Sequence, residues 1–216
     1  MQLLERAQRG LMAFRQEHSG ALYLLTTLFV MGVIFGALAV RSLDPGDKAE
    51  LVSYLGNTAL TLQHPPQGIG AAVLRQSLVG DAKLLLLFWV LGISLVGVLG
   101  VMLVTFLRGL VTGFVVAFLA AEMGVPGILL ALVGHLPQSL IEVPALILAG
   151  AASVAFSTQV IRSWRERRRV PNFYPALGSY TSILLLLGLV LALSAVVEGY
   201  LSPGLVRLAA SMIHPA

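Results

Sequence analysis

Two long apolar runs constrain this chain more than any other feature of its sequence. Residues 84–107 and residues 183–197 carry no charged side chain. A helix needs about 20 mostly apolar residues to cross the hydrocarbon core of a bilayer. Charged residues make up 11% of the chain, against roughly 25% in soluble globular domains. We therefore expect an integral membrane protein.

Division of the apolar regions at charged and turn-forming residues predicts five membrane spans. They cover about residues 21–40, 84–104, 106–123, 138–160 and 180–197. The predicted fold is an all-α, polytopic membrane helical bundle. Because no polar stretch is long enough for a second soluble domain, residues 1–216 are expected to form a single membrane domain.

Shorter elements are predicted around these spans. A continuous helix over residues 127–160 would be about 50 Å long, which exceeds the roughly 30 Å core. Pro137 lacks a backbone N–H, so we predict a break at residues 134–137 and a short or re-entrant helix before the fourth span. Amphipathic helices are expected in the external loop, residues 41–83, and at the C-terminus, residues 204–213.

Basic residues gather on one side of the predicted spans. Three arginines precede the first span, five follow the fourth, and Arg108 is placed in a turn between the second and third. Cytoplasmic segments are enriched in Lys and Arg, so we predict a cytoplasmic N-terminus and an extracytoplasmic C-terminus in the cell membrane. The net charge of +4 follows this arrangement and is not taken as a sign of nucleic-acid binding.

The first span has a second interpretation. It ends in Ala37-Leu38-Ala39, which has the form of a signal peptidase site. The apolar stretch of residues 21–40 is longer than the roughly 7–15 residues of a signal peptide's central region. An uncleaved membrane anchor is therefore favoured over cleavage after Ala39.

Motifs for common catalytic and cofactor chemistry are absent from the sequence. The chain has no cysteine, which excludes disulfides, thiolate metal sites and thiol nucleophiles. It also lacks the Gly-Lys-Ser or Gly-Lys-Thr end of a phosphate loop, the His-Glu-x-x-His zinc motif and the Gly-x-Ser-x-Gly elbow. We therefore predict a protein that is not an enzyme and uses no metal or cofactor.

One polar patch lies within an apolar region. His135, Gln138 and Glu142 have the spacing i, i+3, i+7, which places them on one helical face. Pro137 and Pro144 flank the patch and free backbone carbonyls nearby. Polar side chains in lipid usually face a protein interior or a cavity. The patch is interpreted either as a polar clasp between helices or as an ion or substrate pathway.

Two small-residue motifs predict close helix packing. Gly32-x-x-x-Gly36 and Gly109-x-x-x-Gly113 allow two helix backbones to approach, either inside one protomer or in a homodimer. A second outlying acid, Glu198, follows the fifth span, where an interfacial or capping role is expected.

The external loop has an apolar face of its own. Leu51, Tyr54 and Leu55 share one side of a helix expected over residues 47–61. This face must lie on the bilayer or on a partner, so we predict a docking surface for an extracytoplasmic protein.

The segment LPQSLIEVPALILAG, residues 136–150, resembles the signature segment of the stage II sporulation protein M family. Members of that family often carry Asn where Arg108 stands, so no role is carried over to this position. Further similarities are residues 32–36, residues 106–109 with Gly113, and Glu198 before Ser202-Pro203.

The resemblance implies a role in forespore engulfment. Members of the family act with stage II sporulation proteins D and P, which degrade peptidoglycan. It therefore implies a non-enzymatic scaffold in the septal or engulfing membrane of the mother cell, with these two enzymes and membrane lipid as partners. A transporter or channel that uses residues 135–142 is the alternative, and an intramembrane enzyme is a weaker one.

The predicted orientation can be tested by cysteine labelling, since the chain has no native cysteine. Single cysteines at Gln63 and Ser211 should react with a membrane-impermeant thiol reagent in intact cells, because both positions are predicted to lie outside. A cysteine at Ser163 should react only after the membrane is opened. Labelling of Ser163→Cys in intact cells would contradict the five-span orientation.

Overall fold

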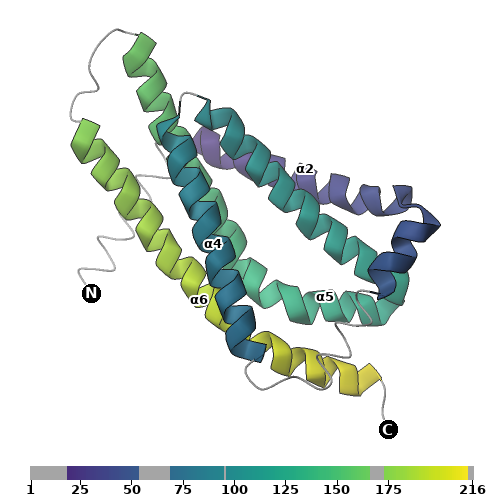
Figure 1. The fold of residues 1–216 in the computed structure, drawn as a ribbon. Helices are drawn as coiled ribbons and strands as arrows, with labels where there is room; N and C mark the ends of the chain where they lie inside the picture. The colour runs from purple at the N-terminus through teal and green to yellow at the C-terminus, as the bar shows by residue number, and fades with distance from the viewer. Residues whose placement is uncertain (1–18, 54–68, 95, 166–172, 214–216) are drawn as a thin grey trace.

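The computed structural model describes residues 19–53, 69–94, 96–165 and 173–213, which form helices and short turns. Residues 45–53 form a further short helix. Figure 1 shows the helices as one bundle in which the long helix α5 turns back on itself. The elements are α2 (Ser19–Ala39), the 3₁₀ turn η1 (Val40–Ser42), α4 (Ile69–Ile93), α5 (Gly97–Arg165) and α6 (Phe173–Ile213).

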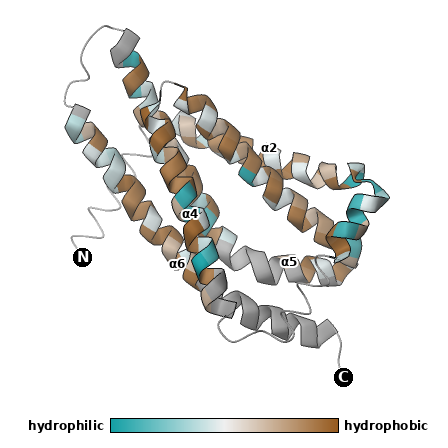
Figure 2. Ribbon diagram, viewed as in Figure 1, coloured by the Kyte–Doolittle hydropathy of each residue, from teal (hydrophilic) through white to brown (hydrophobic). Residues whose placement is uncertain are grey.

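Five helical stretches are long and apolar enough to cross a membrane. Figure 2 shows them as mostly hydrophobic ribbons with isolated hydrophilic turns. The all-α, polytopic bundle predicted from the sequence is confirmed. The spans are Ser19–Ser42, Leu74–Ile93, Gly97–Val125, Ser139–Arg162 and Tyr174–Val196.

The fourth span is the centre of the bundle. In an 18-residue apolar window of this span 61% of the residues are buried, against 17–28% in the corresponding windows of the other four spans. Ala149, Ala151 and Ser153 are fully buried there, and such small side chains let neighbouring helices approach closely. On α6, by contrast, Leu185 and Leu189 are 68% and 67% exposed. These outer leucines form an apolar surface suited to lipid.

The turn between the second and third spans lies between Ser94 and Gly97, so the predicted turn at Arg108 is wrong. The backbone N–H of Ser94 donates to the Leu91 carbonyl at 3.0 Å, and that of Gly97 donates to the Ser94 carbonyl at 3.1 Å. A Cβ at Gly97 would overlap the carbonyl oxygen of Leu91. Because this turn lies inside an uninterrupted apolar run, hydropathy does not reveal it. Arg108 lies inside the third span instead.

The predicted break at residues 134–137 is also wrong, because the backbone is helical through Pro137. Membrane helices tolerate proline when the freed carbonyl finds another partner. The non-helical angles within α5 are at Gly124, with φ 61° and ψ −135°, a region that glycine enters without steric cost. Pro126 follows where a helix begins and its missing N–H costs nothing. Figure 1 shows residues 125–138 crossing one end of the bundle before the fourth span.

Two amphipathic segments predicted as separate helices continue the spans. α4 begins at Ile69, so the end of the external loop is part of the second-span helix. α6 runs to Ile213, so the helix expected at residues 204–213 continues the fifth span. The remainder of the external-loop helix beyond Ser53 lies outside the described residues.

Four glycines hold α2 against the third span. They are the two pairs that the sequence marks as packing motifs. A Cβ added at any of them would overlap a backbone oxygen of the facing helix, so the two backbones are in direct contact. Gly32 meets Phe106, Gly36 meets Leu110, Gly109 meets Phe29, and Gly113 meets Val33. The two motifs therefore face each other within one chain.

Hydroxyl groups join the fourth span to its neighbours. The hydroxyl of Tyr180 on α6 donates to the Phe88 carbonyl on α4 at 2.7 Å and lies 3.0 Å from the Ser153 hydroxyl. Ser157 donates to the carbonyl of Ser94 at 2.9 Å. These three contacts give polar groups of neighbouring helices partners within the protein, as a helix bundle in a membrane requires.

The glycine contact predicts the effect of one added methyl group. Gly113→Ala should lower the midpoint of thermal unfolding in detergent, because its Cβ would overlap the Val33 carbonyl and overpacking typically costs about 1–3 kcal/mol. Gly20→Ala on α2 is the matched control, since nothing lies within 4 Å of its Cβ. The control should be neutral or stabilising by up to about 1 kcal/mol. Equal midpoints for the two variants would contradict the packing assignment.

Candidate functional site: a charge cluster between three spans

The site is built around an arginine inside the third span. Arg108 is the only charged residue between Leu84 and Ala121. Its backbone carbonyl accepts a hydrogen bond from the Thr112 hydroxyl at 2.9 Å, one helical turn further on. A charged side chain in the middle of a span is costly unless it is paired or reaches water. The helices around Arg108 must therefore supply a counter-charge.

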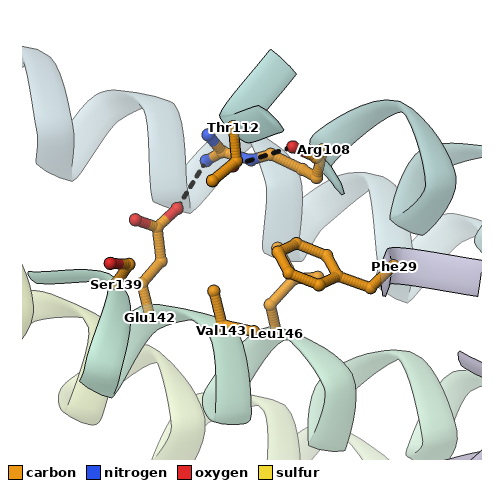
Figure 3. A pocket seen from close by; sticks show the side chains of 7 residues that line it. All are labelled: Phe29, Arg108, Thr112, Ser139, Glu142, Val143 and Leu146. Carbon is orange, nitrogen blue, oxygen red and sulfur yellow. Dashed lines mark hydrogen bonds and ion pairs between the residues drawn. The ribbon is translucent and has the colours of Figure 1, made fainter. Parts of the chain in front are cut away.

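Two carboxyl groups meet this guanidinium. Atom Nη2 of Arg108 lies 3.0 Å from Oε1 of Glu142 and 3.8 Å from Oδ1 of Asp81. Glu142 comes from the fourth span and Asp81 from the second. Figure 3 shows Arg108 and Glu142 pointing toward each other from facing stretches of helix. We call Asp81, Arg108 and Glu142 the charge cluster.

The two contacts differ in kind. The Arg108–Glu142 distance is that of a charge-assisted hydrogen bond, whereas 3.8 Å to Asp81 is too long for a hydrogen bond and leaves electrostatic attraction. Both carboxyl side chains are 9% exposed, and the Arg108 side chain is 38% exposed. Glu142 is therefore the principal partner of Arg108, and Asp81 is the weaker one.

A small pocket adjoins the charge cluster. Its free volume of about 20 Å³ is close to the space that one water molecule needs. Pockets for organic ligands span about 300–1,000 Å³. Among the described residues, the site can hold helices together and admit water, and the space that they enclose is too small for an organic substrate. Its walls are Phe29, Arg108, Thr112, Ser139, Glu142, Val143 and Leu146 (Figure 3).

The same part of the structure offers no metal centre. Among the described residues no group of three or more His, Cys, Asp or Glu side chains is placed to hold an ion. The charge cluster itself contains a guanidinium, which cannot ligate a cation.

The structure locates part of the predicted polar patch. Glu142 is buried at 7% exposure and pairs with Arg108, while Pro144 is exposed on the same helix. His135, Pro137 and Gln138 lie on helical backbone of α5, but their side chains are outside the described part of the structure. The sequence analysis places Arg108 in a turn and does not predict its pairing with Glu142.

The structure describes only part of the remaining predicted site residues. Leu51 is partly buried in the short helix of residues 45–53, whereas Tyr54 and Leu55 fall outside the described residues. Glu198 lies on helical backbone of α6, and its side chain is outside the description.

Sequence reasoning missed Arg108 and Asp81 as site residues. Asp81 falls inside the external loop predicted for residues 41–83. Arg108 was assigned to a turn because charges usually end a span. The available signal was the apolar sequence on both sides of Arg108, with more than a helical turn of uncharged residues in each direction.

Five apolar helices with paired charges between them define a multi-pass helical membrane protein. The family model described as stage II sporulation protein M matches residues 25–203. The chain belongs to this family, whose members are sporulation membrane proteins. Comparison with curated proteins and with solved structures found no match.

The charge cluster predicts unequal effects of removing its members. Arg108→Gln should destabilise the protein strongly, by about 3–5 kcal/mol, because it removes the cation that lies 3.0 Å from the buried carboxyl group of Glu142. Glu142→Gln should cost less, since an amide still accepts a hydrogen bond from Arg108, and Glu142→Leu should cost more than Glu142→Gln. Unfolding in detergent or bicelles would measure these differences.

Arg75→Gln is the control for the arginine substitution. Arg75 is exposed on α4, and surface changes usually stay within about 0.5 kcal/mol. A double-substitution cycle of Arg108→Gln with Glu142→Gln should show coupling, as expected for residues in contact. Equal effects of Arg108→Gln and Arg75→Gln would contradict a structural role for the cluster.

Proposed function

We propose that this protein is a non-enzymatic membrane scaffold for peptidoglycan-remodelling enzymes during forespore engulfment. Stage II sporulation proteins D and P are the proposed partners. Membership of the stage II sporulation protein M family supports a role in sporulation. The partner assignment comes from the family resemblance of residues 136–150 and is tested below.

The scaffold proposal rests on the close pairing within the charge cluster and on the small space beside it. A transport pathway needs a cavity at the depth of its ionisable residues. Here Arg108 is paired with Glu142 at 3.0 Å, and the adjoining space is about that of one water. These features favour a cluster that holds spans in register over one that passes a solute.

A scaffold for peptidoglycan enzymes must present a surface on the outer side of the membrane. The short helix of residues 45–53 lies at the end of the bundle where α5 bends back (Figure 1), and α5 has its non-helical backbone angles at Gly124. Apolar side chains are exposed at both places: Val52 at 43%, Val125 at 70% and Ile128 at 44%. Residues 45–53 and 123–129 are therefore the proposed docking surface.

A transporter or channel remains the second candidate because Arg108 is not fully enclosed. Its side chain is 38% exposed and borders the pocket (Figure 3). An ionisable residue within a span often marks an ion pathway. This candidate and the scaffold differ in what they require of Glu142.

Docking can be tested with substitutions in the helix expected over residues 47–61 of the external loop. Combined Leu51→Asp and Leu55→Asp should reduce co-purification of stage II sporulation proteins D and P from sporulating cells, because charge would disrupt the apolar docking face. The control replaces the same two residues by Met, which keeps the face apolar and should retain both partners. Undiminished recovery with the Asp variant, at equal membrane levels, would contradict the proposed docking surface.

Glu142→Gln separates the scaffold from the conduction candidate. A scaffold needs the hydrogen bond to Arg108 but no titratable group, so the variant should retain partner binding and engulfment. Engulfment is scored by fluorescence microscopy of the migrating membrane. Normal folding and partner recovery with blocked engulfment would favour conduction over the scaffold.

A further inference from the structure

One face of α4 carries a row of exposed side chains in which basic and apolar residues follow each other. The row has three- or four-residue spacing, which aligns its members along one side of a helix. Its two basic residues are exposed, and its three apolar residues are 45%, 61% and 52% exposed. We call this row the α4 stripe; in chain order it consists of Arg75, Val79, Lys83, Leu86 and Val90.

The α4 stripe points away from the bundle. On the opposite side of the same helix, Asp81 and Phe88 are buried at 7% and 0% exposure. A Cβ added to Gly80, beside the stripe, would meet nothing within 4 Å, so no other helix covers this part of α4. The stripe therefore lies on the outer surface of the bundle, where lipid surrounds a membrane protein.

Lys83 lies at an unusual depth for a lysine on that surface. It belongs to the second span, Leu74–Ile93, and about 15 Å of helix separates it from Ile93. A charged side chain within a span is costly unless it is paired or its long stem carries the charge to the membrane surface. Among the residues that the structure describes, the ion pairs of the spans belong to Arg108 and involve neither cation of the stripe. We therefore expect the Lys83 ammonium to extend along α4 toward the lipid headgroups.

The order of groups along the stripe matches that of a phospholipid. Arg75 and Lys83 lie about 12 Å apart along the helix, toward its N-terminal end. Leu86 and Val90 continue the same row into the apolar part of the span. A phosphate group held by the cations would place its acyl chain along these two apolar side chains. A water-soluble acidic partner would match only the charged end of the stripe.

We propose that the α4 stripe binds an anionic phospholipid, with the phosphate at the Lys83 ammonium and an acyl chain along Leu86 and Val90. Lysine offers three hydrogen-bond donors to the phosphate. Arg75 adds a second positive charge on the headgroup side, and basic residues near the membrane surface attract anionic lipids. The site is separate from the charge cluster, and the inference does not depend on the scaffold proposal.

Native mass spectrometry of the full chain in detergent tests this site. The protein is titrated with phosphatidylglycerol and, separately, with phosphatidylcholine that has the same acyl chains. We expect tighter binding of phosphatidylglycerol, because its headgroup carries a net negative charge. Lys83→Gln should weaken phosphatidylglycerol binding about fivefold, the contribution of one basic residue at an anionic membrane surface. Lys83→Arg should retain the affinity, since it keeps the positive charge.

Arg41→Gln is the matched control. Arg41 is also basic and exposed, but it lies in η1 and outside the α4 stripe. Its removal should leave the affinity for phosphatidylglycerol unchanged, although the net charge falls by the same amount as in Lys83→Gln. Inorganic phosphate should not displace the lipid, because it makes no contact with Leu86 and Val90. Circular dichroism checks that each variant is folded, which is expected because the replaced side chains are exposed.

Three results would overturn the proposal. Equal affinities for the two lipids would make Lys83 a general membrane anchor. Equal losses in Lys83→Gln and Arg41→Gln would show that only net charge matters. Displacement of the lipid by inorganic phosphate would indicate a phosphate site without a place for the acyl chain.

Discussion

An arginine in the middle of an apolar helix constrains the arrangement of every span around it. The third span can be buried in the bundle only if other helices bring carboxyl groups to Arg108. Glu142 and Asp81 come from the fourth and second spans, so one guanidinium connects three of the five spans. Such a contact contributes more to specific arrangement than to net stability, because desolvation of the charges offsets much of their attraction.

Close backbone packing places a second restraint beside the first. Gly109, next to Arg108, meets the backbone of Phe29 on α2, and Phe29 also lines the pocket beside the cluster. α2 thus covers one side of the charged groups while it packs on the third span through small residues. Further along the bundle, the Tyr180 hydroxyl contacts Ser153 and the Tyr180 ring stacks on Phe156, and both contacts join α6 to the fourth span.

Hydropathy predicts the class of fold well, because the apolar character of a span depends only on that span's own residues. It misplaces the turn between Ser94 and Gly97 because that turn is formed by small residues without charge. It also places a break near Pro137 where the helix continues, and misses Gly124, whose φ of 61° depends on local backbone geometry. Glu142 was recognised as an intramembrane acid, but its pairing with Arg108 depends on helix packing that spacing along one helix does not specify.

The order of the charged residues along the chain has a consequence for membrane insertion. Asp81 precedes Arg108, and the two lie in adjacent spans joined by a tight turn. A nascent chain therefore carries an acid for the arginine before the fourth span is synthesised. In the hairpin of the second and third spans, the charge of Asp81 offsets that of Arg108 without any later residue. Glu142 is synthesised later, with the most buried span, and in the folded bundle it makes the shorter contact to Arg108.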